Sequence, residues 1–167
     1  AHRDSGGWDY WVDKEAGIGY IRMTQFLRQT ADDMDKAVAQ MKREGKVNAI
    51  VLDLRFNPGG LLSTASGVVD RFIDRGRIVS TVNAEGITTT SQSASRRNTY
   101  NEDIELVILI NQGSASASEI VSGALQDYER ATILGENSYG KGSVQDIFPL
   151  GRGEALFKCT TQYYQLP

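Results

Sequence analysis

Residue types that many active sites need are nearly absent from this chain. Its 167 residues include one cysteine, Cys159, and one histidine, His2, at the extreme amino terminus. A single cysteine excludes an internal disulfide and a cysteine metal cluster. A histidine at the very end of the chain argues against a Ser-His-Asp triad or a Cys/His site. Because Cys159 lies in a strand-like segment, we expect it to be a small core residue.

Long apolar runs and an excess of basic charge are also missing. No stretch approaches the roughly 18 apolar residues that a membrane span needs, and no signal peptide is visible. The formal net charge of −3 gives no indication of a nucleic-acid partner. A hydrophobic content of 40% suffices for one core, so residues 1–167 are expected to form a single globular domain.

Apolar periodicity predicts an α/β fold. The runs 49–54 and 106–110 have the uninterrupted apolar character of strands that are buried on both faces. Apolar stripes of helical period occur at Met34, Ala37, Val38 and Met41, at Val68, Val69, Phe72 and Ile73, and at Ile120, Val121, Ala124, Leu125 and Tyr128. Further strands are predicted at 8–12, 17–23, 78–82, 131–134, 143–148 and 155–161.

The regions between these elements are predicted in less detail. Thr30 is expected to be the N-cap of the first helix and Gly45 its C-terminal stop. The aromatic residues near the amino terminus, from Trp8 to Trp11, are expected to pack in the core and on the sheet. Residues 83–103 lack apolar periodicity and predict an exposed segment or hairpin, and 149–154 predict a hairpin turn.

Ser116 follows the strand 106–110 and lies at the first turn of the predicted third helix. The free backbone N–H groups and the positive end of the helix dipole there favour an oxyanion, which the amide of Ala117 could hold. A structural role competes with this one, because Ser116 and Glu119 also form the Ser-x-x-Glu pattern of a capping box. Taken alone, the capping role explains the serine better.

Lys141 lies between two glycines in the loop 135–142. A solvated surface lysine needs no such setting, whereas a lysine that is desolvated in a pocket has a lowered pKa and can accept a proton near neutrality. The loop also resembles a phosphate-binding P-loop, Gly-x-x-x-x-Gly-Lys. However, Gly142 replaces the Ser or Thr that would bind magnesium, and a strand pattern follows where a helix should begin. Nucleotide binding is therefore not favoured.

A pair of glycines, Gly59 and Gly60, follows the strand 49–54. Adjacent glycines at the carboxyl end of a strand leave unobstructed amides where α/β sheets bind ligands. A tight turn explains the same residues without any ligand. Asp53 and Arg55, two residues apart on the strand, point to one face and are expected to fix this loop rather than to do chemistry.

The segments GSASASEIVSGAL and RATILGENSYGKGSVQ resemble the carboxy-terminal processing, or tail-specific, proteases, which are serine peptidases with a Ser/Lys dyad. The resemblance covers about residues 18–167, and the interval between Ser116 and Lys141 is the one that the family pattern uses. It implies that Ser116 is the nucleophile, that Lys141 is the general base and that Gln145 orients the lysine. Ser114 and Ser118 are then neighbours of the nucleophile.

The same resemblance extends to the motif Asp53-Leu-Arg-Phe-Asn-Pro-Gly-Gly-Leu61. It implies that an amide of Gly59 or Gly60 completes the oxyanion hole with Ala117. The implied fold is a ClpP/crotonase-like core of repeated strand-strand-helix units. Family members normally carry a PDZ domain before this core and continue beyond its last residues, so the chain is expected to be a fragment of the catalytic core.

The function that the resemblance implies is endopeptidase cleavage near the C-terminal tails of protein substrates, with no metal or cofactor. It also implies an extracytoplasmic location, periplasmic or membrane-associated, and leaves the oligomeric state open. Arg96 and Arg97 could meet a substrate carboxylate but are more simply a solvated basic pair. The alternatives are a non-catalytic ligand- or peptide-binding module of the same fold and a hydrolase of small esters or amides.

Overall fold

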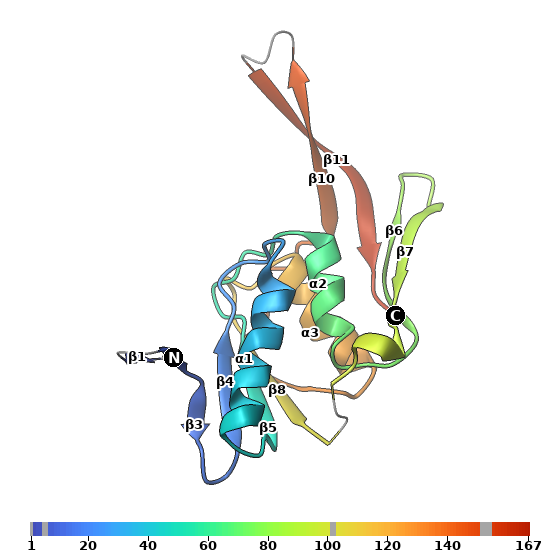
Figure 1. Cartoon of the computed structure of the whole chain (residues 1–167). Helices are drawn as coiled ribbons and strands as arrows, with labels where there is room; N and C mark the ends of the chain where they lie inside the picture. The colour runs from blue at the N-terminus through green and yellow to red at the C-terminus, as the bar shows by residue number, and fades with distance from the viewer. Residues whose placement is uncertain (1, 5–6, 101–102, 151–154) are drawn as a thin grey trace.

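The main body of the molecule is built on a five-stranded sheet (Figure 1). The structure is a computed structural model that describes residues 2–4, 7–100, 103–150 and 155–167. The sheet has the order β3-β4-β5-β8-β9. Its strands are β3 (Trp11–Asp13), β4 (Ile18–Arg22), β5 (Ala49–Asp53), β8 (Glu105–Ile110) and β9 (Thr132–Gly135). The pairs from β4 to β9 are parallel and only β3 is antiparallel, so the carboxyl ends of four strands meet at one edge.

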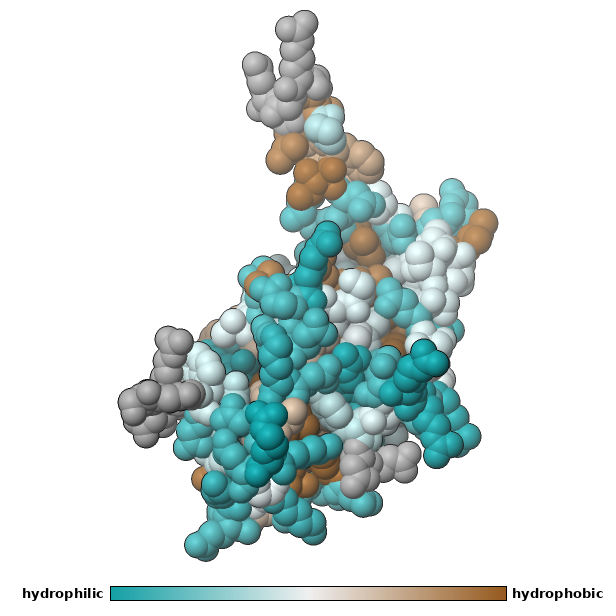
Figure 2. All heavy atoms as spheres, viewed as in Figure 1, coloured by the Kyte–Doolittle hydropathy of each residue, from teal (hydrophilic) through white to brown (hydrophobic). Residues whose placement is uncertain are grey.

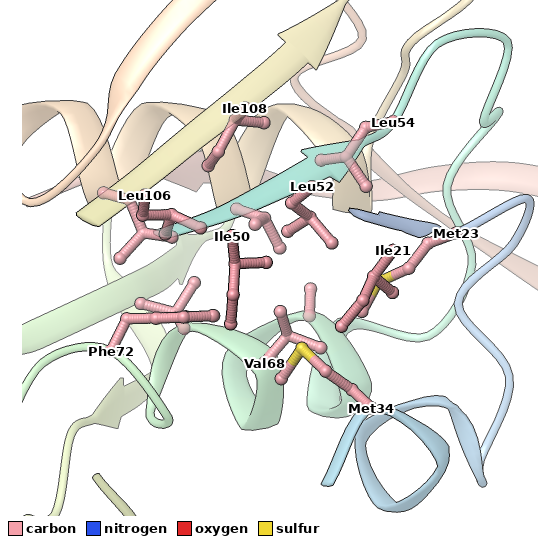
Figure 3. Packing of buried hydrophobic residues seen from close by; sticks show 14 of the residues in the cluster. Ile21, Met23, Met34, Ile50, Leu52, Leu54, Val68, Phe72, Leu106 and Ile108 are labelled. Atoms are coloured by element: carbon pink, nitrogen blue, oxygen red, sulfur yellow. The ribbon is translucent and has the colours of Figure 1, made fainter. Parts of the chain in front are cut away.

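Three helices connect these strands and bury their apolar stripes. They are α1 (Thr30–Glu44), α2 (Leu62–Val69) and α3 (Ala117–Asp127). Figure 3 shows Ile50 and Leu52 of β5 facing Val68 of α2 and Met34 of α1 in one shared core. The α/β class predicted from periodicity is confirmed, and the apolar runs of β5 and β8 lie at the centre of the sheet.

A second sheet extends from the body as two antiparallel hairpins in the order β10-β11-β6-β7. Its strands are β6 (Arg77–Val82), β7 (Thr88–Ser93), β10 (Ser143–Leu150) and β11 (Ala155–Gln165). The last residues of β11 pair with β6, while its first part pairs only with β10, and this part of the β10–β11 hairpin projects away from the body (Figure 1). Figure 2 shows that apolar residues gather on this projection.

The smaller elements complete the description. A two-stranded sheet of β1 (His2–Asp4) and β2 (Gly7–Asp9) precedes β3, and a 3-10 helix, η1, spans Arg96–Asn98. The segment 83–103 is therefore partly the predicted hairpin, because β7 pairs with β6. The turn predicted at 149–154 has its first two residues in β10, and the other four lie outside the described residues. In the described part of the chain, no helix is both long and apolar enough to cross a membrane.

The predicted start of α1 is wrong by one residue. Gln29, not Thr30, occupies the N-cap position. The Thr30 hydroxyl accepts a hydrogen bond from the Leu27 backbone N–H at 2.9 Å and donates to the Gln25 carbonyl at 3.2 Å. Thr30 therefore stabilises the turn before the helix, while Gly45 ends the helix as predicted.

Other predictions failed where an apolar side chain turned out to lie at the surface. Cys159 is not a core residue: it lies half-buried on the projecting part of β11. Trp8 is exposed, although Trp11 is half-buried and donates its indole N–H to Glu44. Tyr128 lies at the C-cap of α3 and is 36% exposed, and its hydroxyl donates to the Arg77 carbonyl.

Candidate active site

Ser116 lies on a sharp turn that joins β8 to α3. Its backbone angles are φ 55° and ψ −112°, a region that residues with a side chain rarely adopt. Such strain persists only where the surroundings impose it, and it is typical of a nucleophile presented between a strand and a helix. The turn is fixed by Asn111, whose side-chain oxygen accepts hydrogen bonds from the N–H groups of Phe56 and Gly113.

The three serines of the turn have different surroundings. The Ser114 hydroxyl donates to the Leu54 carbonyl at 2.8 Å, and the Ser118 hydroxyl donates to the Asn57 carbonyl at 2.9 Å. Both are completely buried and hold the turn against the loop that follows β5. The Ser116 hydroxyl instead lies 3.2 Å from the hydroxyl of Tyr164. Of the three, Ser116 is therefore the serine whose hydroxyl lies next to another side-chain hydroxyl, whereas the other two bind backbone carbonyls.

Ser116 and Lys141 line the same cavity, which has a volume of about 270 Å³. Its lining residues are Ser116, Glu119, Ile120, Gly140, Lys141, Gly142, Tyr164 and Leu166. Lys141 is half-buried rather than enclosed, and no carboxylate of the described residues forms an ion pair with it. The structure thus brings together the two residues that the sequence pairs, one on the turn before α3 and the other on the loop after β9.

Gln145 is not part of this cavity as the structure stands. It lies exposed on β10, directly after a register shift between Val144 and Gln145, and pairs with Thr160 of β11. Within the described ranges, its side chain forms no hydrogen bond with Lys141. A bulge of this kind changes the direction in which a strand presents its side chains.

Glu119 makes more contacts in the site than the sequence indicated. One carboxylate oxygen accepts hydrogen bonds from the backbone N–H of Ser116 at 2.7 Å and of Lys141 at 2.9 Å. The other accepts from the hydroxyl of Ser138 at 2.8 Å and the N–H of Gly140 at 2.6 Å. The Ser-x-x-Glu pattern predicted the first of these contacts, but no local pattern could reveal the other three.

Gly59 allows the loop after β5 to lie directly against the turn that carries Ser116. A Cβ atom added at Gly59 would lie 2.8 Å from the Ser116 Cβ and 3.0 Å from the Ala117 nitrogen, and the backbone φ of 102° disfavours any side chain. The Gly59 N–H is already occupied, because it donates to the Asn57 side-chain oxygen at 2.9 Å. By contrast, neither the Gly60 N–H nor the Ala117 N–H donates a hydrogen bond within the described part of the chain.

Asp53 fixes the start of this loop, as predicted. Its carboxylate accepts three hydrogen bonds from Arg55, through the backbone N–H, Nε and Nη2, and a fourth from the Tyr20 hydroxyl at 2.5 Å. The side chain is fully buried. Burial alone would raise the pKa of Asp53, but the hydrogen bonds from Arg55 and Tyr20 lower it to about 2. Asp53 is therefore a charged anchor at neutral pH.

Comparisons with known proteins identify relatives of this chain. A carboxy-terminal-processing protease of Bartonella bacilliformis is 45% identical over 153 residues, which cover 90% of this chain and 35% of that protein. A carboxyl-terminal-processing protease of Synechocystis is 40% identical over 146 residues, covering 87% of this chain and 33% of its own length. The chain thus spans about a third of the length of these curated relatives.

Solved structures of proteases also resemble this chain in fold. A photosystem II D1 C-terminal processing protease superposes with a TM-score of 0.79 at 35% identity, covering 89% of this chain and 38% of that one. A putative S41 protease of Bacteroides fragilis has a TM-score of 0.72 at 18% identity, covers 88% of this chain and 42% of that one, and supports the fold alone. The profile described as "Peptidase family S41" matches residues 17–167, and the chain therefore belongs to peptidase family S41.

Proposed function

We propose that the protein is a serine endopeptidase that cleaves protein substrates near their C-terminal tails. The observation that carries the proposal is the arrangement of Ser116, on a strained turn, with its hydroxyl in a cavity that Lys141 also lines. Strained backbone conformations cluster at active sites, and Ser116 has such a conformation. The names of the relatives supply the reaction class, since several are described as carboxyl-terminal-processing proteases.

In the proposed reaction, the Ser116 oxygen attacks the carbonyl carbon of the scissile peptide bond while Lys141, as a neutral amine, accepts the hydroxyl proton. The tetrahedral intermediate collapses when the ammonium of Lys141 donates that proton to the leaving amine, and an acyl-enzyme remains. A water molecule, deprotonated by the same lysine, then attacks the ester carbonyl. The lysine ammonium returns the proton to the Ser116 oxygen as the ester bond breaks, which releases the new C-terminal carboxyl group and restores the Ser116 hydroxyl and the neutral lysine.

The oxyanion would be held by two amides. We assign them to Ala117, at the N-terminus of α3, and to Gly60, because these N–H groups have no acceptor within the described residues. The alternative donor, Gly59, is occupied by Asn57 and serves instead to bring its loop close to Ser116. Gln145 completes the proposed set: it would orient Lys141 once its side chain turns from the surface of β10 toward the lysine.

The properties of the whole protein belong to the same proposal. Its substrates would be proteins or peptides with accessible C-terminal tails, and its location would be extracytoplasmic, periplasmic or close to a membrane. The peptidase core would be joined to a PDZ domain and to further core segments, since the chain spans about a third of its relatives. A non-catalytic binding module is not favoured, because it gives no reason for a strained serine beside a lysine.

The test uses the full-length protein, a peptide substrate and a fluorophosphonate that labels reactive serines. Labelling is expected at Ser116. Ser116→Ala and Lys141→Ala should each lower kcat/KM by about a hundredfold or more, and the double variant should be little worse than either, because the two residues act as one unit. Lys141→Arg should be equally inactive, since arginine keeps the charge but cannot give up its proton.

An active Lys141→Arg variant would leave Lys141 a structural or electrostatic role. Failure to label Ser116 in a folded protein that cleaves peptides would remove the serine mechanism altogether.

A further inference from the structure

We propose that Glu119 is a positioning residue that couples two segments, the nucleophile turn (residues 111–116) and the lysine loop (residues 135–142). This inference rests on the proposed dyad. The carboxylate is the meeting point of two segments that are far apart in sequence. It accepts from the Ser116 N–H on one side, and on the other from Ser138, Gly140 and Lys141. A single Glu119 oxygen joins the backbones of both dyad residues, at 2.7 Å and 2.9 Å.

A capping box explains only part of this arrangement. In a capping box the glutamate satisfies the N-cap amide, which here is the Ser116 N–H. The remaining three donors come from residues 138–141, outside the helix and nineteen to twenty-two positions further along the chain. These three contacts add nothing to the capping of α3, so their consequence is the placement of the lysine loop relative to Ser116.

Two further hydrogen bonds hold the lysine loop to the rest of the protein independently of Glu119. The Tyr139 N–H donates to the Ser114 carbonyl at 2.9 Å, and the Gly142 carbonyl accepts from the Tyr164 N–H at 2.8 Å. Both contacts lie outside the Glu119 network and flank Lys141 on either side. Loss of the Glu119 carboxylate should therefore leave the loop attached to the protein but release the backbone of Lys141 itself from Ser116.

The chemistry of the site requires a carboxylate and not an amide. Three of the four partners are backbone N–H groups, which can only donate, and an ionised carboxylate can only accept. Glutamine has almost the same shape, but its NH₂ group would face either the Ser116 and Lys141 amides or the Gly140 amide. Glu119→Gln therefore breaks the coupling without leaving a void, while Glu119→Asp keeps the charge but is one methylene too short.

The experiment measures kcat, KM and the rate of fluorophosphonate labelling at Ser116 in the full-length protein. Displacing a catalytic group by about 1 Å can cost about a hundredfold in rate. Glu119→Gln should therefore lower kcat and the labelling rate by about tenfold to a hundredfold while KM changes by less than about threefold. Circular dichroism at the assay temperature should show that the variant is folded, and Glu119→Asp provides a second variant if it is not.

A matched control separates positioning from a general loss of negative charge. Glu136→Gln removes an exposed carboxylate from the same loop, and among the described residues Glu136 is bonded through its backbone N–H, to the Ile110 carbonyl. This control is expected to keep kcat within about threefold of the original protein, well short of the loss that misplacement of a catalytic group causes.

The outcomes distinguish this inference from the proposed function. If Ser116 of the unmodified protein is not labelled, the dyad itself is wrong. If Ser116 is labelled but Glu119→Gln keeps kcat within about threefold, or changes only KM, the positioning role is overturned. Equal loss of activity in Glu136→Gln would also overturn it, because the effect would then come from charge and not from the contacts of Glu119.

Discussion

At the scale of single residues, Gly59 is the point where the two loops of the candidate site touch. Its backbone adopts a φ of 102°, and an added Cβ would overlap the Ala115 carbonyl, at 2.7 Å, and the Ser116 Cβ, at 2.8 Å. Both the backbone conformation and the space therefore exclude a side chain. Gly86 offers a natural comparison, because its φ is 76° but an added Cβ would have no neighbour within 4 Å.

Gly59→Ala should consequently be far more damaging than Gly86→Ala. In Gly86→Ala, the new side chain meets no neighbour but must adopt a positive φ, so the variant should lose about 1 kcal/mol of unfolding free energy. Gly59→Ala adds a steric overlap with the nucleophile turn and should cost at least about 2 kcal/mol more, with loss of Ser116 labelling. Urea denaturation and fluorophosphonate labelling measure the two effects. Equal stability of the two variants would show that the close approach at Gly59 is unimportant.

Much of the site could be predicted residue by residue, and the limit has a physical cause. The pairing of Ser116 with Lys141 was implied by the resemblance to the carboxy-terminal processing proteases, and both residues line one cavity. Tyr164, whose hydroxyl lies 3.2 Å from that of Ser116, was not foreseen. The sequence gives no signal for a contact between residues 48 positions apart, because such contacts are set by how β11 packs on the body and not by local propensity.

At the scale of secondary-structure elements, periodicity succeeded where strands and helices have a buried face. Helix α1 buries the four predicted residues, and β5 and β8 are the central strands. Periodicity could not place β7 within the predicted exposed segment or hairpin 83–103, because the Thr and Ser side chains of β7 are mostly exposed and show no apolar alternation. It also missed Tyr100, which packs edge-to-face on Phe72 and donates to Asp35, so the segment after η1 is anchored by an aromatic residue.

The ion pair of Asp53 links neighbouring elements, because Tyr20 lies on β4 and Asp53 ends β5. The folded-state pKa of Asp53, about 2, lies below its ordinary value of 3.8. The ionised carboxylate therefore contributes stability that is fully present above about pH 4 and is lost as the pH falls through about 2. A shift of this size corresponds to about 2 kcal/mol.

Asp53→Asn should therefore lower the unfolding free energy by about 2 to 3 kcal/mol at pH 7, since the loop loses its charged anchor. The difference from the original protein should shrink as the pH falls from about 4 to 2, where Asp53 itself becomes protonated. Asp33→Asn is the control, because Asp33 forms an exposed ion pair with Lys36 and this substitution should change stability by less than about 1 kcal/mol. A pH-independent difference would contradict this account.

At the scale of the whole molecule, the projecting β10–β11 hairpin stands apart from a well-packed body (Figure 1). Phe148 and Phe157 face each other across its two strands and are 47% and 51% exposed. Ile147, Leu150 and Leu156 are exposed on the same hairpin. Because successive side chains of a strand point to opposite faces, both faces of this hairpin carry exposed apolar residues. Exposed apolar side chains on strands with few neighbours tend to recruit other protein chains.

The 167-residue chain is accordingly expected to associate at tens of micromolar, a concentration range in which exposed apolar strands aggregate. Replacing Phe148 and Phe157 together by Thr keeps strand propensity but removes the aromatic surface, so it should reduce association. Lys158→Thr, an exposed change on the same strand, should not. Sedimentation velocity over a concentration series measures this, and unchanged association of the double variant would locate the adhesive surface elsewhere.

The strained backbone conformation of Ser116 implies a conflict between thermal stability and the proposed activity. A residue with a side chain adopts φ 55° and ψ −112° at a cost of about 1 to 3 kcal/mol, whereas glycine adopts this conformation freely. Ser116→Gly should therefore have no peptidase activity yet melt at a higher temperature than the original protein, while Ser116→Ala should be inactive without that gain. The serine that the proposed reaction needs is then held in a conformation that costs the fold stability, and selection for thermal stability alone would favour its replacement.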